Sequence, residues 1–181
     1  MANAVTRVVH RCEEASESLF LDLSECQLMQ VPDAVYHLMR NTELKGCNLS
    51  GNVITKIPPK FAVKFSFLSN LNLSNNQMSK LPDELADLAA LERLDISHNA
   101  FIALPHAVYK MPKLIKLNAS HNHIVEIEVD RLETTDSLEE VDLQENPLSI
   151  PNRNALQVLS RPRIILSIQE TEEEDWDDLN V

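Results

Sequence analysis

The chain has 181 residues, of which 44% are hydrophobic and only 4% are aromatic. This length suits one domain with its own core, and the composition excludes collagen-like chains, disulfide scaffolds and wholesale disorder. No apolar run approaches the roughly 18 residues of a membrane span. The first residues also lack the apolar core of a secretory signal. We therefore expect no membrane association and a cytoplasmic location, with the nucleus as the alternative.

Acidic residues outnumber basic ones by 28 to 16, which gives a formal net charge of −12. The Lys and Arg residues form no run, so a phosphate backbone would be repelled and nucleic acid is an unfavourable ligand. Seven of the acids lie within residues 170–181. The excess negative charge is therefore largely that of a C-terminal tail, which its composition predicts to be disordered.

An amphipathic helix is predicted at the N-terminus, over residues 2–17. Val5, Val8, Val9 and Cys12 fall at i, i+3, i+4 and i+7, so they share one helical face. We assign residues 1–17 to a helix that caps the array of repeats that follows.

A repeat of the form LxxLxLxxNxLxxL occupies residues 18–169, in about six to seven copies. In each copy the LxL pair alternates with a polar residue, which predicts a short strand. A marker residue follows each predicted strand, and successive markers are 26, 24, 23, 23 and 24 residues apart. These markers are Cys26, Asn52, Asn76, Asn99, Asn122 and Asn146. A buried Asn offers an acceptor and two donors to backbone groups at a turn, so we expect the markers to stack as an internal ladder.

Each copy also has a return segment, commonly opened by proline. Leu85 and Leu88 illustrate its apolar stripe, three residues apart, which predicts a short helix or 3-10 turn. The pattern loosens where Glu128 replaces the proline, and Ile164, Leu166 and Ile168 alternate as a last strand. The predicted fold is an α/β solenoid, with a curved parallel sheet on the concave side and short helices on the convex side.

These repeats resemble the leucine-rich repeat family, in its intracellular class with an LPxxL return. The segments LFLDLSECQLMQVP at residues 19–32 and VYHLMRN at residues 35–41 resemble the family of leucine-rich repeat-containing protein 20. The resemblance implies a small solenoid that binds proteins and has no enzymatic activity. It brings no binding residues with it.

Candidate binding residues therefore follow from the expected geometry of the concave face. Outward positions between the core leucines are Asp and Asn, and the next outward positions are mostly Ser. A preceding column is chemically mixed, with Phe20, Arg93 and Lys116. The candidates for contact with a partner are Phe20, Asp22, Asn48, Asn72, Arg93, Asp95, His98, Lys116, Asn118, His121 and Asp142. The competing interpretation is that these small polar residues only keep the sheet soluble.

No catalytic, cofactor or small-molecule site is predicted. His98 and His121 share a repeat position near Asp95, which raises a metal site as an alternative, but no fixed ligand set follows. Phosphate-binding glycine loops and nucleophile motifs are absent from a sequence with two glycines. The three cysteines form no paired clusters, which favours reduced, structural thiols.

The tail offers a second route to a partner. Trp176 stands among acids and could serve as an aromatic anchor, and Val181 could present a C-terminal carboxylate. The favoured function is a monomeric, non-catalytic intracellular adaptor that binds a protein through its concave face. The alternative is an acidic regulator whose tail occupies a basic partner, such as a histone or an enzyme of the phosphatase type.

Overall fold

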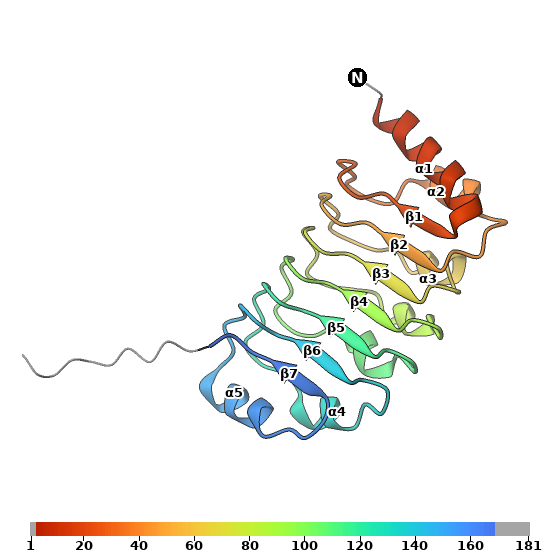
Figure 1. The fold of residues 1–181 in the computed structure, drawn as a ribbon. Coiled ribbons are helices and arrows are strands. Elements are labelled where there is room, and N and C mark those ends of the chain that lie inside the picture. The colour runs from red at the N-terminus through yellow and green to blue at the C-terminus, as the bar shows by residue number, and fades with distance from the viewer. Residues whose placement is uncertain (1–2, 169–181) are drawn as a thin grey trace, which may run out of the picture.

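The computed structural model describes residues 3–168, which form a single coil of repeats (Figure 1). Seven strands of three residues each pair in parallel and lie in sequence order, β1 to β7. They are β1 (Phe20–Asp22), β2 (Gly46–Asn48), β3 (Asn70–Asn72), β4 (Arg93–Asp95), β5 (Lys116–Asn118), β6 (Glu140–Asp142) and β7 (Arg163–Ile165). The predicted α/β solenoid is confirmed.

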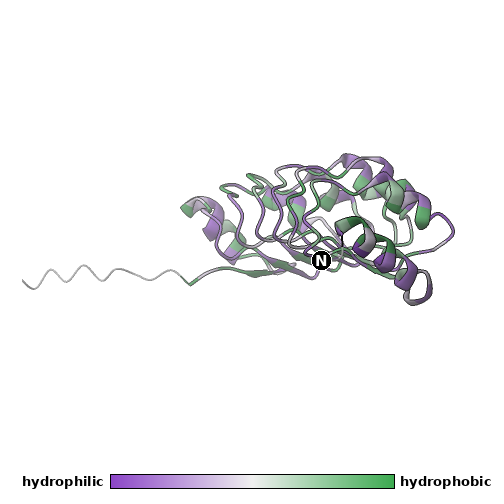
Figure 2. Cartoon of the chain, turned by 90° about the horizontal axis from the view of Figure 1, so that it is seen from above, coloured by the Kyte–Doolittle hydropathy of each residue, from purple (hydrophilic) through white to green (hydrophobic). Residues whose placement is uncertain are grey.

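Short helices return the chain on the convex side, opposite the strands. They are α2 (Asp33–Leu38), α3 (Lys60–Lys64), the 3-10 helices η1 (Asp83–Asp87) and η2 (His106–Lys110), α4 (Val129–Glu133) and α5 (Ile150–Gln157). Pro82 and Pro105 immediately precede the two 3-10 helices, where a missing N–H costs no hydrogen bond. Figure 2 shows the strands and the helical returns as the two sides of the coil.

Equivalent repeat positions pair with one another across the sheet. Leu71 of β3 pairs with Leu94 of β4, which pairs with Leu117 of β5. Because side chains alternate along a strand, this register stacks all the inward leucines behind the sheet. Leu85 and Leu88 of the return segments are fully buried against them. The core therefore runs continuously between sheet and helices, and each repeat is stable only on its neighbours.

The five marker asparagines connect successive repeats through buried hydrogen bonds. The side-chain amide of Asn99 donates to the carbonyl oxygens of Leu73 in the previous repeat, at 3.0 Å, and of Ile96 in its own, at 3.1 Å. Its Oδ1 accepts the N–H of Met78 at 3.0 Å. Equivalent bonds are made by Asn52, Asn76, Asn122 and Asn146. These amides bond backbone groups that the turn after each strand would otherwise leave unpaired.

Helix α1 (Ala4–Ser18) covers the outer side of β1 (Figure 1). It starts where Asn3 accepts the N–H of Val5 and ends at Leu19, whose φ of 61° is left-handed. Its buried residues are Val8, Cys12 and Ala15, spaced four and three apart on one face. Val5, which the pattern predicts on this face, is 66% exposed, and the other residues of the first helical turn, Ala4, Thr6 and Arg7, are exposed as well. None of the described helices is both long and apolar enough to cross a membrane.

The last repeats depart from the predicted pattern. The expected strand at Ile164, Leu166 and Ile168 is limited to Arg163–Ile165, and Ile168 is 93% exposed. Asn152, which the repeat pattern does not mark, is buried in α5. It accepts the N–H of Ile127 at 3.0 Å and donates to the carbonyl oxygen of the same residue at 2.8 Å. This amide restores cross-repeat bonding where the chain has left the regular repeat.

Substitution of Asn99 by Ala tests the contribution of this hydrogen bonding. The change leaves the Met78 N–H without an acceptor and removes one of the two amide donors from each of the carbonyl oxygens of Leu73 and Ile96, so we expect the free energy of unfolding to fall by about 2 kcal/mol. Urea denaturation followed by circular dichroism measures it. The matched control is Asn70→Ala, on the exposed face of the sheet, which should change stability by less than about 0.5 kcal/mol. Equal midpoints for the two variants would contradict the role of the buried amide.

Candidate partner-binding face

Each strand presents two side chains on the concave side, one before and one after the inward residue. The position before it forms a column that we call the front column: Phe20, Gly46, Asn70, Arg93, Lys116, Glu140 and Arg163. The position after it holds only Asp or Asn in the first six strands, and we call it the Asx column: Asp22, Asn48, Asn72, Asp95, Asn118 and Asp142. The two columns differ in role, because the Asx column takes part in the turns and the front column carries the exposed charges.

The side chains of the Asx column form hydrogen bonds that stabilise the turn after each of the first six strands. Asn72 is half-buried, and its Oδ1 accepts the backbone N–H of Ser74 at 2.9 Å. The Oδ1 of Asp95 accepts both the N–H and the hydroxyl of Ser97, at 2.9 and 2.6 Å. All six residues make the backbone bond to the residue two positions later. One oxygen of each candidate in this column is therefore engaged in the fold itself.

The serines that follow were expected as a second exposed polar column, and for three of them this expectation is wrong. Ser74, Ser97 and Ser120 are only 5–7% exposed. They lie in the turn that the Asx side chain closes, so the chain has already left the concave face. This region offers a partner less polar surface than the sequence pattern suggests.

Backbone geometry explains where His98 and His121 lie. The residue immediately before each ladder position has a positive φ, and these residues are Glu25, Gly51, Asn75, His98, His121 and Glu145. Left-handed backbone is costly for most side chains and least so for Gly, Asn, Asp and His. The rings of His98 and His121 stack with centroids 4.1 Å apart, exposed at the end of neighbouring strands.

The front column carries the exposed charges of the sheet. Glu140 lies between two cations, 3.7 Å from the Lys116 ammonium and 3.4 Å from the Arg163 guanidinium. Arg93 is exposed and forms no ion pair with the described part of the chain. Arg93, Lys116 and Glu140, together with Asp95 and its neighbours, line a shallow hollow of about 270 Å³ over β3 to β6.

The first two strands are unlike the rest of the column. The ring of Phe20 lies over Gly46, where an added Cβ would come within 2.4 Å of it. Gly46 therefore gives Phe20 the space to lie across β2, although 47% of Phe20 remains exposed. Asp22 is paired 2.8 Å from the Arg11 guanidinium of α1. This candidate contact residue thus takes part in attaching the cap.

Comparison with known proteins agrees with this geometry. A family model described as leucine rich repeat matches residues 42–101. The chain has the fold of a leucine-rich-repeat solenoid. It is 34% identical over 96 residues to leucine-rich repeat-containing protein 20 of Homo sapiens, which covers 51% of this chain and 52% of that protein. The Mus musculus protein of the same name is 33% identical over 92 residues, or 49% and 50% of the two chains. The solenoid thus spans about half the length of the curated relatives it matches.

Solved structures share the solenoid fold. A leucine-rich repeat protein of Leptospira interrogans superposes with a TM-score of 0.66 and 28% identity, covering 78% of this chain and 35% of that one. InlP of Listeria monocytogenes gives 0.63 and 24%, covering 81% and 38%. A TLR13-ssRNA13 complex gives 0.69 and 23%, covering 82% and 21%. The last two likenesses concern the fold alone.

The described part of the solenoid holds no group of three or more His, Cys, Asp or Glu residues arranged for a metal ion.

Its three cysteines, Cys12, Cys26 and Cys47, are free and buried. Burial, with smaller contributions from Cys12 and Asp22, raises the pKa of the Cys47 thiol to about 12. Such a thiol stays protonated and unreactive at neutral pH. The tail candidates Trp176 and Val181 lie outside the described residues.

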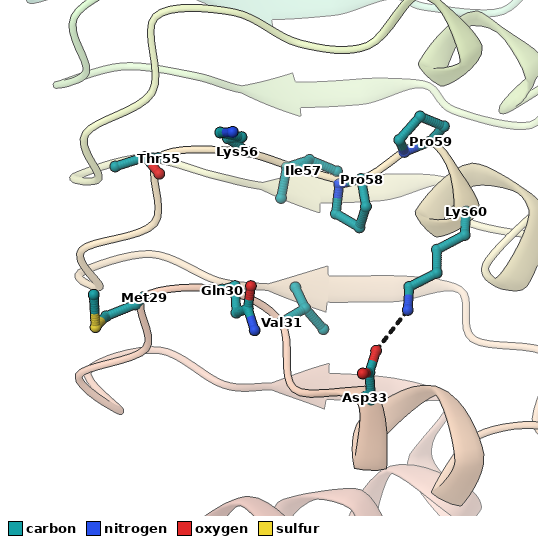
Figure 3. A pocket seen from close by; sticks show the side chains of 10 residues that line it. All are labelled: Met29, Gln30, Val31, Asp33, Thr55, Lys56, Ile57, Pro58, Pro59 and Lys60. Atoms are coloured by element: carbon teal, nitrogen blue, oxygen red, sulfur yellow. Dashed lines mark hydrogen bonds and ion pairs between the residues drawn. The ribbon is translucent and has the colours of Figure 1, made fainter.

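A second hollow, of about 490 Å³, lies on the flank between the first two repeats (Figure 3). Met29, Val31, Ile57 and Pro58 supply its apolar wall, and Lys60 reaches Asp33 across it at 2.5 Å. This ion pair between exposed side chains is a weak link between adjacent repeats. These residues occupy ordinary positions of the return segments, so no motif in the sequence marks them as a site.

Because Asp22 pairs with Arg11 of α1, we expect the contribution of the N-terminal cap to stability to depend on pH. Burial acts to raise the pKa of the Asp22 carboxyl, but hydrogen bonds from Ser24 and the nearby Arg11 guanidinium outweigh it and hold the pKa below its usual value. A lowered carboxyl pKa contributes stability above about pH 4 that is lost as the pH falls further. The difference in Tm between the unchanged chain and Asp22→Asn should therefore be present at neutral pH and shrink below about pH 4. Glu13→Gln, on the exposed side of α1, is the control; a difference that is constant with pH would refute this role of Asp22.

Proposed function

We propose that this solenoid is a non-catalytic interaction module that binds a protein partner across the front column of β3 to β6. The observation that carries the proposal is Arg93, which is exposed in the concave hollow without an ion-pair partner among the described residues. Arginine is favoured at the centres of protein interfaces because its planar guanidinium forms bidentate bonds and packs on flat groups. The other cation of the hollow, Lys116, lies by contrast 3.7 Å from Glu140.

The chemistry of the hollow favours a partner that offers a carboxylate opposite Arg93. Lys116 is adjacent in the front column, so a carboxylate placed between the two cations would bond Arg93 and also weaken the link from Lys116 to Glu140. The Asx column beneath it has one oxygen committed to each turn, which gives a rigid floor. A rigid site loses little conformational entropy when it binds.

A nucleic acid is a less favourable partner. The TLR13-ssRNA13 complex shares the fold at 23% identity, but here the formal net charge is −12. Phosphate contacts require gathered cations, but the hollow holds two cations, Arg93 and Lys116, beside three acids, Asp95, Glu140 and Asp142. We therefore propose protein recognition.

The tail supports a second candidate function, that of an acidic regulator. Residues 170–181 carry seven acids and the single tryptophan of the chain. Such a segment could occupy a basic surface, and its binding would weaken steeply with salt. Binding of this kind requires the tail, whereas binding through the concave face does not require it.

A photo-crosslinking amino acid at Asn70 tests the proposal directly. Asn70 is exposed at the edge of the hollow, and Val63, 71% exposed on α3, is the matched convex position. In cells, we expect a protein to be captured from position 70 and not from position 63. Arg93→Glu should reduce this capture at least about tenfold, as loss of a central Arg contact does. Lys113→Glu, an exposed residue outside the front column, should leave it unchanged.

Deletion of residues 170–181 separates the two candidate functions. Capture from position 70 that survives this deletion supports the concave face. Capture that is lost with the tail, or that is equal from positions 63 and 70, contradicts the proposed face.

A further inference from the structure

The two ends of the solenoid are covered very differently. At the first strand, α1 places Val8, Cys12 and Ala15 against the core, and all three are buried. At the last strand, Ile164 and Leu166 are only half-buried and Ile168 is 93% exposed. Within residues 3–168, β7 pairs only with β6. A repeat array requires a cap at each end, because its last repeat otherwise exposes both apolar core and unpaired strand edge.

A hollow of about 770 Å³ lies at this open end, between α5 and β7. Leu156, Leu159, Ile164 and Leu166 give it an apolar wall, and two arginines, Arg153 and Arg163, give it positive charge. This volume accommodates the indole ring of tryptophan, which has the largest side chain of the standard amino acids. The site therefore combines apolar contacts with positive charge, which suits an aromatic group that is accompanied by anions.

The arginines are available for such anions. The Nη2 atom of Arg153 donates to the carbonyl oxygen of Ser167, but its Nε is buried and has no partner among the described residues. The Arg163 side chain is 76% exposed and lies 3.4 Å from Glu140. A buried donor without an acceptor is costly, so Arg153 favours a ligand that supplies one.

We propose that residues 169–181 of the same chain occupy this hollow as a C-terminal cap. Trp176 fills the apolar part, and the flanking carboxylates pair with Arg153 and Arg163. The segment carries seven acids and no base, so its charge is complementary to that of the site. Trp176 is eight residues beyond Ile168, which itself lines the hollow, and eight residues span up to roughly 27 Å when extended. The tether is therefore long enough, and it raises the local concentration of the tail at the site.

The single tryptophan makes the proposal directly measurable. Intrinsic fluorescence of the full chain reports on Trp176 alone, and a synthetic peptide of residues 169–181 gives the signal of the free segment. We expect the full chain to emit at shorter wavelength than the peptide and to be less quenched by acrylamide. High salt should move both signals towards those of the peptide, since ion pairs contribute to docking.

Arg163→Glu is the test variant, and Arg93→Glu, the same charge change on the concave face, is its matched control. Arg163→Glu should shift the emission towards the peptide value, whereas Arg93→Glu should leave it unchanged; circular dichroism verifies that both variants fold. Emission and quenching of the full chain equal to those of the peptide would overturn the proposal. A blue shift that disappears on dilution would overturn it as well, because it would place the tail of one molecule on the end of another. These outcomes are independent of capture from position 70, so either proposal can fail alone.

Discussion

The hydrogen bonding of the stacked asparagines is the interaction on which the solenoid depends. Strands of three residues form few ladder bonds of their own, and each strand is followed by a sharp turn that exposes backbone groups to the core. One buried amide satisfies two carbonyl oxygens and one N–H, and it does so between repeats as well as within them. The Asx column then closes the turn from the concave side. The repeat length is constrained because both sets of side chains must reach the same turn.

This constraint divides the concave face into a structural column and a free one. Asn72 and Asp95 each have an oxygen bonded to the backbone two residues later, so changes there alter the turn as well as the surface. Arg93 and Lys116 in the front column are exposed, and their side chains form none of these turn hydrogen bonds. Substitutions in the front column can therefore change the exposed surface of the sheet while the fold is kept. The proposed function rests on this column, and the proposed cap concerns only the last repeat.

Much of the fold could be predicted from sequence because the repeat reports on buried positions, which are periodic. Inward leucines, marker asparagines and return segments each recur at fixed spacing. The burial of Ser97 and the left-handed backbone at His98 could not be predicted, because they follow from turn geometry rather than from hydropathy. Asn152 was missed since it lies in a helix outside the regular spacing. The pairing of Arg11 with Asp22 depends on how α1 docks, which no pattern within either segment specifies.

Amide hydrogen exchange measured residue by residue tests the central role of the asparagines most directly. The N–H groups of Ile54, Met78, Phe101 and Ile124 lie outside the strands and donate to asparagine side chains of the next repeat, at 3.0–3.1 Å. If the asparagine bonds join the repeats, these four amides exchange as slowly as those of the central strands, because they open only when repeats separate. Exchange at the rate of exposed loop amides would contradict this role, since the repeats would then be joined by strand pairing and apolar packing without the asparagine bonds.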